Sequence, residues 1–265
     1  MSIQKLSLAG VQKTRAYIQE TLIIPDLENN PTTVSLLEME EEPPEPTSLD
    51  SLGDLFRAAS DPEDVISAPN REGRWFLSSA NAAIALKKLP GLNLRKDVRL
   101  VTYLLRTAKG GQGVTWAVPE WASGTAQLEE ALVDRDVSQA PQPQPHLDHL
   151  MEALEGDRSG TSYVMASLYW REVQEFGWVG SQCRWVHHRL VDQVPAQAQW
   201  EWKTKQPQDF LPKVRVFEDG RVAVEFFTCY VKTPVTLYRH LDQYTPDSYV
   251  PQSTDRPMAI ALKSS

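Results

Sequence analysis

The sequence predicts an α+β protein: a small helical, winged-helix-like unit, followed by two helices packed on an antiparallel sheet of about five strands. Three observations predict this class. Residues 213–231 alternate between apolar and polar side chains on both sides of Asp219-Gly220, a pattern typical of a β-hairpin. Residues 159–177 place apolar side chains at helical spacing. Residues 78–118 suggest the order helix, tight turn, helix, glycine turn and strand, which is the order of a helix-turn-helix with a wing.

Residues 1–68 predict an acidic, largely flexible arm. They hold 13 of the 35 acidic residues and 4 of the 27 basic ones, a net charge of −9, which leaves 22 acids and 23 bases, or +1, for the remainder. Within the arm, residues 11–22 predict a short helix, and like charges and prolines exclude a helix from residues 38–48. Residues 48–59 predict a second short helix, which either recognises a partner or packs on the protein's own core.

Residues 70–135 form the second predicted unit. Ser78 or Ser79 can cap a helix that runs to Leu89, where Pro90-Gly91 stops it. A second helix over residues 94–108 ends at two glycines, and GVTWAVPEW (113–121) predicts a strand. The proline- and glutamine-rich residues 136–146 predict an extended linker to the next unit.

Residues 147–265 predict the helix-and-sheet domain. A helix over residues 146–155 comes first. A longer helix follows, capped by Ser159 or Thr161 and closed by Gly177. Five strand-like runs come next, and a last strand is expected at residues 258–262; the five runs cover residues 182–191, 199–203, 214–218, 221–231 and 235–242. Strands that follow helices in this way indicate an antiparallel sheet with helices on one face.

A basic stretch lies in the predicted second unit. On a helix, Arg95, Arg99 and Arg106 would share one face, which would meet the phosphates of a nucleic acid, contact a protein or the acidic arm, or simply be solvated. The candidate residues for an ionic or nucleic-acid contact are Lys87, Lys88, Arg95, Lys96, Arg99 and Arg106.

Five of the eight tryptophans lie between residues 170 and 202. Large aromatic side chains of this kind either form a core between helix and sheet, line a cavity for an apolar ligand, or make an exposed patch for protein binding. For the last interpretation the candidate residues are Trp178, Trp185, Trp200 and Trp202.

Catalytic and metal-binding motifs are missing from the sequence. It contains no GxSxG, P-loop, GxGxxG or HExxH pattern, and Cys183, His187 and His188 lack the spacing of a zinc site. We therefore expect no enzyme, no cofactor and no metal. No run of 18 apolar residues and no signal peptide is evident, and two cysteines do not suggest a disulfide framework, so we expect a cytoplasmic protein without a membrane span.

Two segments, GVTWAVPEW (113–121) and SYVMASLYWREVQEFG (162–177), resemble parts of soluble cyanobacterial proteins of unassigned function. The resemblance implies a cytoplasmic setting and an accessory role in a photosynthetic cell, and it brings no catalytic residue. Together these observations predict a non-catalytic protein-interaction or assembly factor. The alternatives are a nucleic-acid-binding regulator that uses residues 78–118, and a small apolar ligand carrier or an enzyme that uses a sheet cavity.

Overall fold

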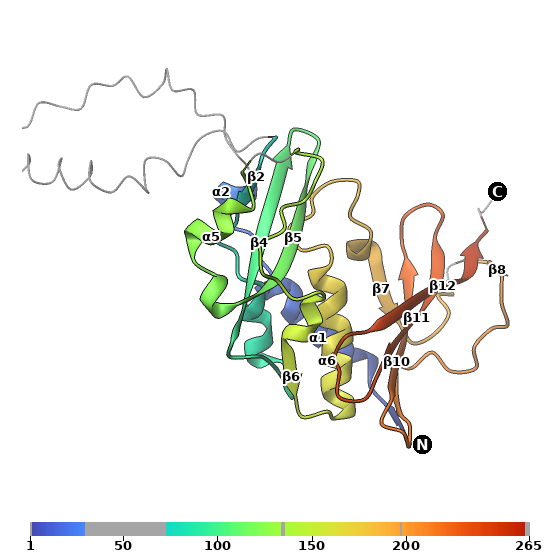
Figure 1. Cartoon of the computed structure of the whole chain (residues 1–265). Helices are drawn as coiled ribbons and strands as arrows, with labels where there is room; N and C mark the ends of the chain where they lie inside the picture. The colour runs from blue at the N-terminus through green and yellow to red at the C-terminus, as the bar shows by residue number, and fades with distance from the viewer. Residues whose placement is uncertain (1, 30–72, 134–135, 197, 263–265) are drawn as a thin grey trace, which may run out of the picture.

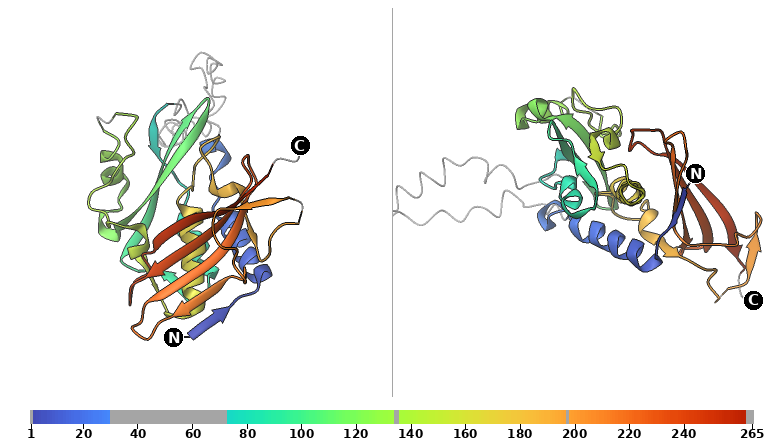
Figure 2. Two further views of the ribbon diagram at one scale, coloured as in Figure 1. Left: turned by 90° about the vertical axis from the view of Figure 1, so that its right-hand side faces the viewer. Right: turned by 90° about the horizontal axis from the view of Figure 1, so that it is seen from below.

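Two antiparallel sheets lie on either side of a layer of helices in the computed structural model, which describes residues 2–29, 73–133, 136–196 and 198–262 (Figures 1 and 2). The helices of this layer are α1 (Leu8–Thr21) and α6 (Gly160–Val173). Shorter helices are α2 (Asp26–Asn29), η2 (Ala82–Lys88), η3 (Glu120–Ala122), α5 (Thr125–Glu130), η4 (Leu150–Ala153) and η5 (Trp185–His187).

The large sheet has seven strands in the order β1-β9-β10-β11-β12-β8, and β7 pairs with β10 beyond the end of β9. Its strands are β1 (Ser2–Lys5), β7 (His188–Val191), β8 (Trp200–Trp202), β9 (Lys213–Val216), β10 (Val222–Tyr230), β11 (Thr236–Tyr244) and β12 (Gln252–Ala261). The second sheet is β2 (Trp75–Leu77), β4 (Val98–Thr107) and β5 (Gly110–Pro119), and β3 (Leu92–Leu94) pairs with β6 (Leu154–Gly156). The mixed α+β class is confirmed, and the large sheet has two strands more than the five expected.

Helix α6 is buried along most of its length. Its N-cap is Ser159, whose side-chain oxygen accepts a hydrogen bond from the backbone N–H of Ser162 at 3.1 Å. Every residue from Ser162 to Tyr169 is buried. The predicted long helix is therefore confirmed, although it ends at Val173, and its buried residues belong to the main core.

The hairpin predicted at Asp219-Gly220 joins β9 to β10, with Val216 opposite Val222. Gly220 has φ +81°, a left-handed conformation that favours glycine. Strand β10 then pairs with β11 along its whole length and carries eight consecutive buried residues.

Residues 2–29, which we predicted to belong to the flexible arm, form β1, α1 and α2. Strand β1 pairs with β9, and Val11 and Ile18 of α1 lie in the main core. The predicted helix at residues 11–22 is thus confirmed. The acidic residues 38–48 and the predicted helix at 48–59 lie outside the described residues.

The prediction of a helix over residues 94–108 is wrong, because residues 98–107 form β4. The glycines at 110 and 111 begin β5 after a tight hairpin turn. Residues 78–118 form no helix-turn-helix, so the winged-helix-like unit is wrong as well; the helix expected up to Leu89 is only the 3-10 helix η2. Residues 146–155, also expected to be helical, form η4 and most of β6.

The predicted linker packs against β5. The indole N–H of Trp116 donates to the carbonyl of Pro141 at 2.7 Å. The backbone N–H of Leu147 donates to the carbonyl of Ala117 at 2.8 Å.

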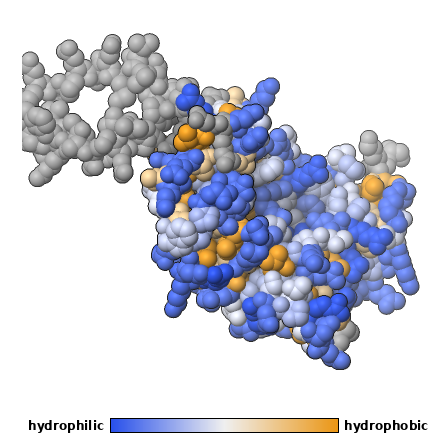
Figure 3. Space-filling view, in the orientation of Figure 1, coloured by the Kyte–Doolittle hydropathy of each residue, from blue (hydrophilic) through white to orange (hydrophobic). Residues whose placement is uncertain are grey.

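One main core includes residues from α1, both sheets and α6. On the face shown in Figure 3, apolar residues are interspersed with hydrophilic ones. No helix among the described residues has the length and apolarity needed to cross a membrane.

Candidate functional site

A groove of about 880 Å³ lies between α1, the C-terminal end of α6 and the segment that leads into β7. Its lining includes three large apolar side chains with substantial exposure, Ile23 (66%), Val179 (42%) and Val186 (47%). Trp178 and Trp185 line the same groove, and the indole N–H of Trp178 donates to the carbonyl of Gly113 at 2.9 Å. The groove therefore has an apolar wall held in place from the second sheet.

Arg15, which also lines the groove, has a compensated charge. Its Nε lies 2.6 Å from Oε1 of Glu172, and both side chains are more than nine-tenths buried. The Arg15 guanidinium also donates to the carbonyl of Trp185 at 2.9 Å and lies 4.6 Å from the centre of the Trp185 ring. These contacts fix Trp185 at the inner wall of the groove.

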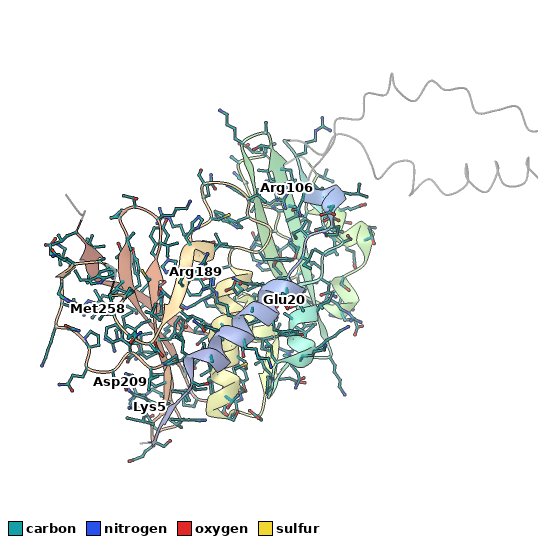
Figure 4. All side chains as sticks on the ribbon, turned by 180° about the vertical axis from the view of Figure 1, so that it is seen from behind. Lys5, Glu20, Arg106, Arg189, Asp209 and Met258 are labelled. Atoms are coloured by element: carbon teal, nitrogen blue, oxygen red, sulfur yellow. The ribbon has the colours of Figure 1, made fainter. Side chains whose placement is uncertain are left out.

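Arg106 is different, because it is 2% exposed and has no carboxylate within 4 Å among the described residues. Its Nη1 donates to the carbonyl of Gly177 at 2.7 Å, and its Nη2 donates to Oδ1 of Asn29 at 3.2 Å. Its Nε is the one buried side-chain nitrogen or oxygen of the described residues that has no hydrogen-bond partner. Burial lowers the pKa of Arg106, and the nearby charge of Glu28 opposes this shift without forming an ion pair within 4 Å. Figure 4 labels Arg106 beside α2, with Arg189 and Glu20 on the same side of the molecule.

A second hollow, of about 600 Å³, adjoins the groove. Trp185 and Glu175 line both. The Glu175 carboxylate accepts hydrogen bonds from the backbone N–H groups of Arg184 at 2.9 Å and Trp185 at 2.8 Å, which fixes this shared wall. The second hollow is also lined by His188, Tyr230, Tyr238 and Asp255.

A chain of hydrogen bonds leads from the second hollow into the core. Nδ1 of His188 lies 2.7 Å from Oγ1 of Thr228, which lies 2.7 Å from Nε2 of His240. Nδ1 of His240 lies 2.7 Å from Oδ1 of Asp255. We call these four residues the relay. They come from β7, β10, β11 and β12, and the register of these strands places their side chains on one face of the large sheet.

Arg171 of α6 forms an ion pair with Asp255, the last residue of the relay. Its Nη2 lies 2.7 Å from Oδ1 of Asp242 and 2.9 Å from Oδ1 of Asp255. Asp242 is fully buried, whereas the Asp255 side chain is 48% exposed. Burial by itself would raise the pKa of Asp255, but hydrogen bonds from His240 and Arg171 hold it well below its usual range.

Both relay histidines are neutral near pH 7. Burial, with the proximity of the titratable His240 and the positive charge of Arg15, lowers the pKa of His188 to about 3. Burial also lowers the pKa of His240, although the hydrogen bond to Asp255 opposes this shift.

Neutral histidines fix the position of each proton in the relay. Asp255 accepts the proton of His240 Nδ1, so His240 Nε2 accepts from the Thr228 hydroxyl. The Thr228 oxygen then accepts from His188 Nδ1, which leaves a lone pair on Nε2 of His188. This Nε2 has no partner among the described residues and is not among the buried unpaired atoms, so it meets the second hollow.

The predicted tryptophan patch is divided between two places. Trp178 and Trp185 line the groove, whereas Trp200 and Trp202 lie on β8 at the other edge of the large sheet. The last two are half-buried against a small core of Cys229, Leu237 and Ala259. The indole N–H of Trp200 also donates to the carbonyl of Pro195 at 2.9 Å.

The predicted basic residues do not share a helical face. Lys87 and Lys88 are exposed at the end of η2, and Lys96 is exposed in the turn before β4. Arg95 pairs with Asp97 at 2.6 Å, and Arg99 pairs with Glu120. Arg106 is buried, and its odd sequence separation from Arg99 places the two side chains on opposite faces of β4.

No three His, Cys, Asp or Glu side chains gather to hold an ion in the part of the chain that the structure describes. Sequence reasoning missed the relay, whose members span 68 positions from His188 to Asp255. The only sequence signal was polar residues at inward positions of otherwise apolar strands, such as Thr228 in β10.

Comparison with family models, with curated proteins and with solved structures gives no match.

Proposed function

We propose that this protein is a non-catalytic interaction factor that binds a segment of a partner protein in the groove lined by Trp178 and Trp185. The observation that carries the proposal is the combination of exposed apolar side chains with a buried arginine that has no ion pair within 4 Å among the described residues. Ile23, Val179 and Val186 offer apolar surface to a partner. Tryptophan and arginine side chains often dominate the free energy of protein interfaces.

The groove is lined by three carboxylates as well as three arginines, and the two arginines that form no ion pair in the described part of the chain indicate the chemistry of the partner. Arg106 lacks an ion pair among the described residues, and Arg189, on the same groove, has an exposed side chain. A carboxylate on the bound segment would compensate this charge, and charge-assisted hydrogen bonds of arginine with carboxylates are strong. The proposed occupant is therefore a protein segment with apolar side chains and an Asp, a Glu or a free C-terminus.

Nucleic acid is a weaker candidate for this protein. The six basic residues that suggested it are dispersed over η2, a turn and both faces of β4, and two of them already pair with acids. The groove offers single arginines within an apolar wall, whereas a phosphate backbone is bound through many charge contacts at once.

Selection from a random peptide library tests the proposal without a known partner. We expect the purified protein to enrich peptides that combine apolar residues with an acidic residue or an acidic C-terminus. Val186→Asp should weaken binding of a synthetic enriched peptide at least about tenfold, or about 1.4 kcal/mol. Val231→Asp is the matched control, because Val231 is 45% exposed and does not line the groove.

Arg189→Glu should also weaken the binding of peptides that carry the acidic group. Arg221→Glu, at an exposed site in the β9–β10 turn, should leave their binding unchanged. Failure to enrich any peptide, or equal binding to the Val186→Asp and Val231→Asp variants, would contradict the proposal.

A further inference from the structure

The second hollow presents an imidazole edge whose chemical character is set by the fold. The His188 ring stacks on Trp185 with 5.2 Å between ring centres. Tyr230 and Tyr238 lie against it at 5.1 and 5.2 Å. These contacts and the hydrogen bond to Thr228 hold the ring in one orientation, with Nε2 toward the hollow.

This edge accepts hydrogen bonds and does not donate them. The relay places the only ring proton of His188 on Nδ1, facing Thr228. Since the pKa of His188 is lowered to about 3, the imidazole stays neutral at physiological pH and is poorly suited to take up a proton in catalysis. An acceptor held in a fixed position is instead suited to recognise an N–H or O–H group.

The charges that line the second hollow are balanced. Its two arginines, Arg171 and Arg184, are matched by the carboxylates of Glu175 and Asp255. Arg171 pairs with Asp255, whereas Arg184 is exposed and forms no ion pair within 4 Å with the described residues. A lining without net charge favours a neutral ligand.

The shape of the lining favours a flat ligand. Tyr230 and Tyr238 are half-buried and line the hollow, so part of each ring remains free for contact. The volume of about 600 Å³ is in the range of sites for small molecules, which are lined by aromatic side chains and a few oriented polar groups. Around the lone pair of His188 lie groups that can donate, namely Arg184 and Gln174, and groups that can accept, such as Asp255.

We propose that the second hollow binds a small neutral heteroaromatic molecule whose ring N–H donates to Nε2 of His188 while the ring packs against Tyr230 and Tyr238. This donor and acceptor pattern on a flat ring is the chemistry of a nucleobase. The proposal is independent of peptide binding in the groove, because it depends on the relay and on the tyrosines.

Histidine-labelled protein gives a direct test by nitrogen NMR. The probes are guanosine, inosine and uridine, whose bases each carry a ring N–H, and each is added to the full-length protein. We expect at least one of them to shift the Nε2 resonance of His188 saturably, in the direction of an accepted hydrogen bond. The control is the same nucleoside methylated at its donating ring nitrogen, such as 3-methyluridine for uridine. It should bind at least about tenfold more weakly, because a site that pairs with an N–H group rejects a ligand that lacks it.

Variants separate recognition from structure. Thr228→Val removes the hydroxyl that fixes the ring proton, so the His188 resonances should show both tautomers and nucleoside affinity should fall about tenfold. Val186→Asp, in the groove, should leave nucleoside binding unchanged, so failure of peptide binding and failure of this site can be told apart.

Three results would overturn the proposal: no nucleoside perturbs His188 Nε2, the methylated counterpart binds equally well, or only an oligonucleotide binds. The first two use the unaltered protein and do not depend on the folding of a variant.

Discussion

Replacing His188 should flatten the dependence of stability on pH in mildly acidic solution. His188 is 9% exposed, and its pKa is lowered from 6.5 to about 3 in the folded protein. Because the unfolded chain takes up a proton below about pH 6.5 and the folded protein does not, the stabilisation is complete above that pH and is lost as the pH falls toward 3. At about pH 5 the solution is about 1.5 units below the pKa of the unfolded histidine. The free energy of unfolding is therefore lower by about 2 kcal/mol than at about pH 7.5.

Urea unfolding followed by tryptophan fluorescence measures this effect in steps between about pH 7.5 and pH 5. Across this interval, the free energy of unfolding of the His188→Gln variant should fall by about 2 kcal/mol less than that of the wild type. Asp255 does not contribute here, since its lowered pKa reduces stability only when the pH falls below its ordinary value of 3.8. The matched control is Arg189→Gln, at the adjacent exposed position of β7. The reasoning is refuted if His188→Gln and Arg189→Gln show the same dependence on pH.

Three further substitutions test the packing around the site. Arg171→Met should lower the free energy of unfolding by about 3–5 kcal/mol, because it leaves the fully buried Asp242 without its partner; chemical denaturation measures this loss. Gly113→Ala should cost about 3 kcal/mol in the same assay, since an added Cβ would lie 2.1 Å from the carbonyl oxygen of Phe176. Ser159→Ala removes the N-cap of α6 and should lower stability by about 1 kcal/mol, whereas Ser159→Asp should restore most of it.

The elements that the sequence predicted well are those with a strong local signal. The hairpin at Asp219-Gly220 combines a turn that requires glycine with alternating flanks, and α6 combines a cap with a long apolar face. Residues 98–107 carry a weaker signal. Their apolar residues fit both a helical and a strand spacing, and only pairing with β5 across a two-glycine turn, which is a tertiary contact, selects the strand.

The four tryptophans predicted as one patch do not lie together. Trp178 and Trp185 both line the groove, because the short segment after α6 leaves them little freedom. Trp200 and Trp202 follow closely in sequence but lie elsewhere, since β7 pairs with β10 whereas β8 pairs with β12 at the far edge of the sheet. No local pattern encodes that crossing. The relay was missed for the same reason, because its four side chains meet only through strand register.

The wall shared by the groove and the second hollow has a thermodynamic consequence. Trp185 and Glu175 line both spaces, and the carboxylate of Glu175 fixes the backbone at Trp185. Any movement of this wall on binding in one space changes the shape of the other. If occupation of the second hollow alters the affinity of the groove by some factor, linkage requires occupation of the groove to alter the affinity of the hollow by the same factor. Two measurements of affinity, each with the other space filled, must therefore give a single coupling free energy.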